Sequence, residues 1–137
     1  MNINELKINN LISHRGLICT VEIINGELNE IYFLGEDFYH WDKPENLEGV
    51  PLTDEWIEEW ILTLPKNKLK FNIKREYVFE AIRFIINKYI ILTIHNDGIV
   101  SLGLLNQSFS IQLKYVHTFQ NIFFALTGKE LTSTKAN

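Results

Sequence analysis

The chain has 137 residues, of which 46% are hydrophobic and 22% charged, and its formal net charge is −4. This size and composition predict one globular domain, and the acidic balance argues against a generic nucleic-acid binder, which is usually basic. No apolar run approaches the roughly 20 residues that span a bilayer, no signal-peptide layout opens the chain, and one cysteine excludes a disulfide framework. We therefore expect a cytoplasmic protein with a single domain over residues 1–131 and a flexible tail over 132–137.

The first quarter of the chain has the pattern of short antiparallel strands. Residues 17–24 alternate between two faces, residues 28–34 follow at once, and residues 5–12 form a candidate first strand ahead of Arg15–Gly16. Between two of these strands, Asn25–Gly26 predicts a type I′ hairpin turn, because both residues tolerate a positive φ. Short strands joined by tight turns predict a curled sheet of the SH3-like half-barrel kind.

The segment from Glu36 to Glu59 is acidic and holds a single basic residue, Lys43. Its first part reads as a loop that interleaves carboxylates with aromatic side chains. Rigid aromatic anchors with steering charge are what a partner-binding patch needs, and we predict one here. Its residues are Glu36, Asp37, Phe38, Tyr39, Trp41, Asp42, Glu45 and Glu48. The alternative is that Phe38 and Trp41 fold inward as a plug for the sheet while the acidic groups face water.

A helix is predicted after this loop, with Thr53 as its N-cap and Pro65 at its end. Its expected buried stripe consists of Trp56, Ile57, Trp60, Ile61 and Leu64. A basic stretch follows at Lys66–Arg75, and the pattern of residues 77–86 fits a helix or a strand.

The remainder of the chain predicts a hairpin, one more strand and a final helix. Residues 88–95 and 99–105 flank the turn at Asn96–Gly98, and residues 108–113 form the next strand. The final helix is expected from about Lys114 to Thr127, with Gly128 as its left-handed stop. Packed on the mostly antiparallel sheet, the two helices complete an α+β fold.

Helical periodicity predicts two faces for the final helix. The core-facing stripe is expected to contain Tyr115, Phe119, Ile122 and Leu126, with Val116 and Phe123 beside it. The opposite face is a second candidate surface, formed by His117, Gln120, Asn121 and Phe124. We expect its polar side chains to bond to neighbouring loops rather than to take part in chemistry.

The sequence shows no pattern typical of catalysis. His14, His40, His95 and His117 lack the short spacing of metal ligands, and Cys19 lies on the inward face of a predicted strand. No serine sits in a nucleophile elbow, and no glycine-rich loop precedes a helix. The prediction is a protein that is not an enzyme and has no metal or cofactor.

Three segments resemble a family of small proteins from phages and mobile elements of Bacteroidota. They are NELKINNLISHRG at the start, VPLTDEWIEEW in the middle and LKYVHTFQNIFFALTGKELT at the end. In that family the last segment is similar to K-Y-V-H-x-L-Q-N-L-Y-F-A-L-T-G-x-E-L-T. The matching residues there are Lys114, Tyr115, Val116, His117, Gln120, Asn121, Phe124, Ala125, Leu126, Thr127, Gly128, Glu130, Leu131 and Thr132; the middle motif is matched by Pro51, Leu52, Thr53, Glu55 and Trp56. Asn9 departs from the pattern, since a glycine is usual there.

The resemblance implies a phage lineage and, through it, a class of function. Small, acidic phage proteins without catalytic motifs often disable host defences by occupying a basic nucleic-acid groove. We therefore expect an anti-CRISPR inhibitor, specifically against an RNA-targeting Cas13b effector of the bacterial host, with a basic protein or ribonucleoprotein surface as partner. A phage scaffold or adaptor that binds another phage protein is the alternative. A third class is a nucleic-acid-binding module that uses Lys66–Arg75.

Overall fold

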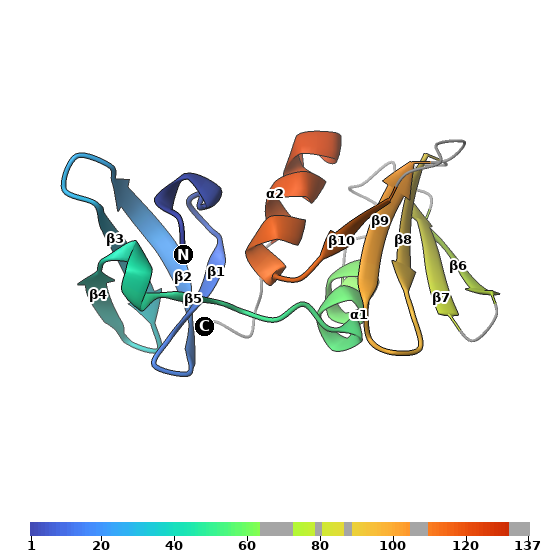
Figure 1. Ribbon diagram of the computed structural model, residues 1–137, viewed down its shortest axis with the longest axis horizontal. Helices are drawn as coiled ribbons and strands as arrows, with labels where there is room; N and C mark the ends of the chain where they lie inside the picture. The colour runs from blue at the N-terminus through green and yellow to red at the C-terminus, as the bar shows by residue number, and fades with distance from the viewer. Residues whose placement is uncertain (64–72, 79–80, 87–88, 105–109, 132–137) are drawn as a thin grey trace. The chain divides into compact units, whose positions relative to one another are not determined.

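The computed structural model describes residues 1–63, 73–78, 81–86, 89–104 and 110–131 (Figure 1). It has an α+β fold with antiparallel strands, one mid-chain helix and one C-terminal helix, as predicted. Where one curled sheet was expected, the ten strands of the described residues form two five-stranded sheets in two compact units. Unit 1 is Met1–Pro51 together with the chain from Tyr115, and unit 2 is the insertion Leu52–Lys114. The single domain over residues 1–131 stays a prediction, and the tail at 132–137 lies outside the described residues.

Unit 1 contains a meander whose last strand returns to the first. The sheet order is β4-β3-β2-β1-β5, with all neighbours antiparallel. Two 3₁₀ turns, η1 and η2, and the final helix α2 complete the unit. The bounds are η1 Ile3–Glu5, β1 Leu11–His14, β2 Leu17–Asn25, β3 Glu30–Gly35, β4 Phe38–Asp42, η2 Pro44–Asn46, β5 Glu48–Gly49 and α2 Val116–Thr127.

The sheet of unit 1 is strongly curled. His14 on β1 and Asp42 on β4 belong to strands separated by two others, yet His14 Nε2 lies 3.1 Å from Asp42 Oδ2. A register shift between Val21 and Ile23 places a bulge in β2, and a bulge increases the local bend and twist of a sheet. This curl agrees with the expected half-barrel, whose SH3-like character stays a prediction. The concave side encloses a core of Leu6, Ile12, Cys19, Val21, Ile31, Phe33 and Leu47.

The hairpin turns of unit 1 differ from the sequence prediction. His14 pairs with Leu17, so Arg15–Gly16 forms a two-residue turn in which both φ angles are positive, 52° and 81°. The type I′ turn predicted at Asn25–Gly26 is wrong, because Asn25 pairs with Glu30 across a four-residue loop. The Asn25 side chain caps that loop by accepting from the Leu28 N–H at 3.2 Å. The candidate strand at 5–12 is also largely wrong, since β1 begins only at Leu11.

Strand β1 is covered on both faces. Leu11 and Ile12 point to opposite sides of the sheet, and both are almost fully buried. Ile12 belongs to the enclosed core, whereas the Leu11 N–H is bonded by a side chain of α2. Just before β1, Asn9 adopts a φ of 72°, which explains why glycine suits this position and why asparagine tolerates it. Helix α2 therefore packs on the outer face of the unit 1 sheet.

In its described residues, unit 2 is a second meander with one helix. The sheet order is β10-β9-β8-β7-β6, so the strands follow one another in sequence. Of residues 77–86, which fitted helix or strand, 77–78 belong to strand β6 and 81–86 form strand β7. The predicted hairpin and last strand are confirmed as β8, β9 and β10. The bounds are α1 Asp54–Thr63, β6 Ile73–Val78, β7 Ala81–Ile86, β8 Ile90–Ile94, β9 Val100–Leu104 and β10 Ser110–Leu113.

Helix α1 begins where the sequence predicted. Its first residue is Asp54, directly after Thr53, and two carboxylates in the first turn suit the positive end of the helix dipole. Trp56, Ile57 and Trp60 are buried, as expected, and the two tryptophan rings lie 5.4 Å apart. Leu64 and Pro65, the predicted end of the helix, lie outside the described residues. Among the helices that the structure describes, none has the length and apolar character needed to cross a membrane.

Candidate functional site

The predicted acidic, aromatic loop is a strand at the edge of the unit 1 sheet. Phe38 through Asp42 form β4, which pairs with β3 and, among the described strands, has a neighbour on one side alone. Phe38, Tyr39 and Trp41 are 68%, 73% and 56% exposed. The plug alternative is therefore wrong for Phe38 and Trp41, and the loop prediction is wrong for this stretch. We call β4 and its flanking carboxylates, Glu36, Asp37, Glu45 and Glu48, the β4 edge surface.

The two faces of β4 carry different aromatic pairs. Successive side chains of a strand point to opposite sides, so Phe38 and His40 share one face while Tyr39 and Trp41 share the other. Phe38 and His40 line a pocket, and the ring of His40 stacks on Phe33 with centroids 5.9 Å apart. An edge strand with exposed aromatics on both sides leaves backbone and apolar surface open for pairing with an added strand.

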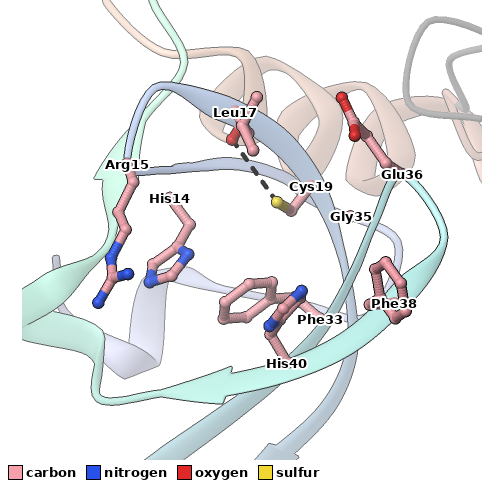
Figure 2. A pocket seen from close by; sticks show the side chains of 9 residues that line it. All are labelled: His14, Arg15, Leu17, Cys19, Phe33, Gly35, Glu36, Phe38 and His40. Carbon is pink, nitrogen blue, oxygen red and sulfur yellow. Dashed lines mark hydrogen bonds between the residues drawn. The ribbon is translucent and has the colours of Figure 1, made fainter.

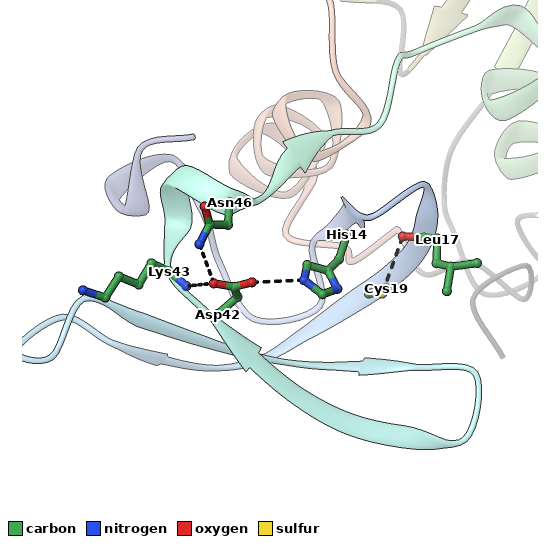
Figure 3. Close-up of polar contacts among 6 residues, drawn as sticks. All are labelled: His14, Leu17, Cys19, Asp42, Lys43 and Asn46. Atoms are coloured by element: carbon green, nitrogen blue, oxygen red, sulfur yellow. Dashed lines mark hydrogen bonds and ion pairs between the residues drawn. The ribbon is translucent and has the colours of Figure 1, made fainter.

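Asp42 differs from the other acidic residues of the edge surface because its carboxylate accepts hydrogen bonds from neighbouring residues of unit 1 (Figure 3). It accepts from Asn46 Nδ2 and from the Lys43 N–H, both at 2.7 Å, and it contacts His14 at 3.1 Å. The hydrogen bond from Asn46, followed by that from Lys43, lowers the pKa of Asp42 below its usual value. Asp42 therefore joins the ends of β1 and β4, and the exposed carboxylates supply the charge that a partner meets.

The pocket beside β4 has a volume of about 270 Å³ (Figure 2). Arg15 stands at one end next to His14, and Glu36 stands at the other end above Phe38. The lining residues are His14, Arg15, Leu17, Cys19, Phe33, Gly35, Glu36, Phe38 and His40. Sequence reasoning missed this pocket, since Arg15 and Glu36 are far apart in the chain. One sequence signal was present: Arg15–Gly16 is a tight turn that pairs β1 with β2 and so brings His14 close to Leu17.

The pocket does not provide an activated nucleophile. Burial raises the pKa of the Cys19 thiol, which therefore stays protonated at neutral pH. The thiol donates to the Leu17 carbonyl at 3.5 Å, and His14 is bonded to Asp42 through Nε2. In the described parts of the chain, no group of three or more His, Cys, Asp and Glu side chains is placed to hold a metal ion. A buried, protonated thiol is a weak nucleophile.

The second candidate surface, on α2, is largely buried. His117 and Gln120 are each 1% exposed, so their assignment to a surface is wrong. Asn121 accepts from Asn10 Nδ2 at 2.9 Å and donates to the Glu5 carbonyl at 2.8 Å. Phe124 is 37% exposed, and Lys7 Nζ lies 5.1 Å from its ring centroid. Together with the hydrogen bond from Gln120 to the Asn9 carbonyl, these contacts tie α2 to the segment before β1, as expected for Gln120 and Asn121. The same expectation is wrong for His117, whose ring nitrogens bond to no group of the described residues.

The buried face of α2 is rotated by roughly 90° from the predicted stripe. Phe119 belongs to both, but Tyr115 and Leu126 are 43% and 46% exposed. The buried residues of the helix are Val116, His117, Phe119, Gln120 and Phe123. The reason is Gln120, whose carboxamide bonds three backbone groups and can therefore be buried at little cost. The end of the helix at Thr127 and the left-handed Gly128, with φ 70°, are confirmed.

His117 is a buried imidazole in the first turn of α2. Its ring stacks on Tyr115, with centroids 5.6 Å apart and planes 12° from parallel. Neither ring nitrogen has a hydrogen-bond partner within the part of the chain that the structure describes. Burial lowers the pKa of His117; Glu5 raises it, and the N-terminal amine lowers it. The folded state therefore holds this imidazole neutral.

Acidification is expected to destabilise unit 1 through His117. The unfolded chain binds a proton near the ordinary pKa of 6.5, whereas the folded chain binds it at lower pH. Stability that is present above pH 6.5 is therefore lost as the pH falls through the folded-state pKa. His117→Phe keeps the stacked ring and should flatten this loss between pH 7.5 and 5. Melting temperatures of parent and variant across that range check it, and equal slopes would exclude His117 as the cause.

A comparison of the chain with family models, curated proteins and solved structures finds no match. The resemblance to phage and mobile-element proteins therefore stays a prediction, and so do the activity and the target that it implies. The assignment of the site residues therefore rests on geometry: an exposed edge strand flanked by carboxylates, and a pocket beside it.

Proposed function

We propose that this protein is a non-catalytic binding protein that recognises a basic partner through the β4 edge surface. One observation carries the proposal: three large aromatic side chains are more than half exposed on an edge strand flanked by exposed carboxylates. Aromatic anchors of this kind dominate the energy of protein interfaces, and edge strands add an extended segment by backbone hydrogen bonds. Burying these aromatics in a partner would remove their contact with water.

The charge of the edge surface defines the chemistry of the partner. Glu36, Asp37, Glu45 and Glu48 are exposed, and Lys43 is the single basic residue between positions 36 and 59. A surface of one sign attracts a partner of the opposite sign and accelerates encounter more than it strengthens the final complex. The partner is accordingly a protein segment or ribonucleoprotein surface rich in lysine and arginine.

The resemblance to phage proteins supports a specific target within this class. An inhibitor of host defence that occupies the basic groove of an RNA-targeting CRISPR effector, in the bacterial cytoplasm, combines an acidic binding surface with the proposed lack of catalysis. A phage scaffold or adaptor is the second candidate, and it predicts a complex with another phage protein and no effect on the effector. The basic stretch Lys66–Arg75 of the nucleic-acid alternative lies outside the described residues up to position 72.

Charge and anchor substitutions are expected to change different rate constants of binding to the purified effector–guide RNA complex. Reversing Glu36, Asp37 and Glu45 to lysine should slow association roughly tenfold at low salt and should leave dissociation nearly unchanged. Trp41→Ala should raise the dissociation rate about thirtyfold, which corresponds to about 2 kcal/mol for the loss of an aromatic anchor. Surface-based kinetics at about 0.1 M and 1 M salt, where the Debye length falls from about 10 to 3 Å, measure both effects.

Tyr89→Ala is the matched control for Trp41→Ala, because Tyr89 is 69% exposed and lies in unit 2. Its kinetics should equal those of the parent, and all variants should keep the parent's melting temperature. Unchanged binding by folded edge-surface variants would refute the surface. If the third class were correct, the charge reversals would strengthen binding to nucleic acid instead.

A further inference from the structure

The pocket beside β4 has the size and lining for one side chain of a bound segment. Its volume of about 270 Å³ lies below the roughly 300–1,000 Å³ of drug-sized ligand pockets. Phe38 and His40 belong to both the pocket and the β4 edge surface, so a segment paired along β4 directs alternate side chains to the face on which the pocket lies. We infer that the pocket receives a single arginine side chain of that segment, an inference that rests on the proposed function and names its specificity.

The walls of the pocket favour a planar cation with an apolar stem. Phe33 is fully buried at the floor, and His14 and His40 lie against it with ring centroids 4.8 and 5.9 Å away. Phe38 meets His40 edge-on, with a centroid distance of 6.3 Å, and stays exposed at the mouth. An arginine side chain packs its methylene groups on such walls and stacks its guanidinium on an aromatic ring, whereas lysine offers only a compact charge.

The charges around the pocket favour a cation over an anion. Glu36 lines it and Asp37 follows in the same turn, while Glu45 and Glu48 add negative charge from the rest of the edge surface. His14 faces the pocket but is bonded to Asp42, so a carboxylate stands behind that imidazole. Arg15 opposes this field from the other end. Removing the charge of Glu36 and removing the charge of Arg15 should therefore change the affinity for a charged occupant in opposite directions.

The test is a titration of the isotope-labelled full chain with Nα-acetyl-L-arginine amide, followed by NMR on Gly35, His40 and the other pocket signals. Saturable shifts confined to the pocket are expected. Glu36→Gln should weaken binding roughly two- to fivefold, and Arg15→Gln should strengthen it by a similar factor, the range measured for exposed charge pairs. Glutamine has the size of the Glu36 side chain and is shorter than that of Arg15, and at both positions, where φ is 39° and 52°, it removes the charge without introducing a β-branched residue.

Two aromatic variants locate the probe. Phe38→Ala should weaken binding of the arginine probe, whereas Tyr89→Ala, an exposed aromatic residue of unit 2, should leave it unchanged. Lysine and tyrosine amides should bind more weakly than the arginine amide. Tighter binding of either, or of Nα-acetyl-aspartate with reversed effects at Arg15 and Glu36, would overturn the inference. No shift in the pocket while the effector complex still binds β4 would refute the arginine site and leave the proposed function standing.

Discussion

Phe119→Ala is expected to lower the free energy of unfolding of unit 1 by about 3–5 kcal/mol. Phe119 is 1% exposed and packs edge-on against Phe123, with ring centroids 6.0 Å apart. Truncation loses the burial of the ring and leaves a cavity between α2 and the sheet, which rigid neighbours fill only in part. Urea unfolding followed on NMR signals of β1 to β4 measures the change.

Leu126→Ala is the matched control, since Leu126 belongs to the stripe predicted from periodicity but is 46% exposed. Its expected effect is below about 1 kcal/mol. Equal losses for the two variants would contradict the observed orientation of α2 and favour the predicted one.

Gln120→Met is expected to cost about 2–4 kcal/mol although it replaces a polar residue by an apolar one of similar length. The Gln120 side chain accepts from the Leu11 N–H at 2.9 Å and donates to the carbonyls of Leu131 and Asn9 at 2.8 and 3.0 Å. Methionine fills the space but leaves buried backbone groups without partners, and an unsatisfied buried group carries its full desolvation cost. The same unfolding experiment measures this loss.

Gln120→Glu provides the control for shape, because it keeps an acceptor for the Leu11 N–H and removes the two amide donors. At high pH the glutamate is ionised, and burying its charge costs additional free energy. We therefore expect Gln120→Glu to be at least as unstable as Gln120→Met. A neutral or stabilising effect of Gln120→Met would show that the network is dispensable and that α2 is held by apolar packing alone.

The orientation of α2 shows where periodicity fails. Hydrophobic spacing placed Phe119, Val116 and Phe123 correctly, because apolar burial dominates the choice of a helix face. It placed Gln120 and His117 on the wrong side, because it treats every polar residue as a solvent-facing one. Two of the three partners of Gln120 lie 109 and 111 residues away in sequence, at Leu11 and Asn9, so no local pattern reveals them.

The turns show a second limit. Asn25–Gly26 has the residues of a tight turn, yet the pairing of Asn25 with Glu30 gives a longer loop. Arg15–Gly16 has one favourable residue and still forms the two-residue turn, with Arg15 at φ 52°. Turn preference competes with strand register, and register is set by which side chains reach the core, here Ile12 opposite Cys19.

The sequence identified which residues belong to the candidate site, but it did not identify the strand and the pocket that they form. The acidic and aromatic residues between Glu36 and Glu48 were identified, and their exposure favours the surface hypothesis over the plug. Their strand was missed because β4 reads Phe-Tyr-His-Trp-Asp, which lacks the apolar–polar alternation of a half-buried strand. An edge strand exposed on both faces has no reason to alternate. The pocket was missed because its lining residues come from four strands, β1 to β4, and from the turns between them, which only the folded sheet brings together.

Amide hydrogen exchange of the full chain, with and without the effector–guide RNA complex, tests the central claim most directly. Binding along β4 predicts slowed exchange in residues 38–42 and in the turn at Glu36, with unit 2 amides such as Tyr89 unchanged. Trp41→Ala should remove most of that protection at the same concentrations. Protection confined to unit 2, or β4 amides that exchange as fast in the complex as in the free chain, would contradict the account.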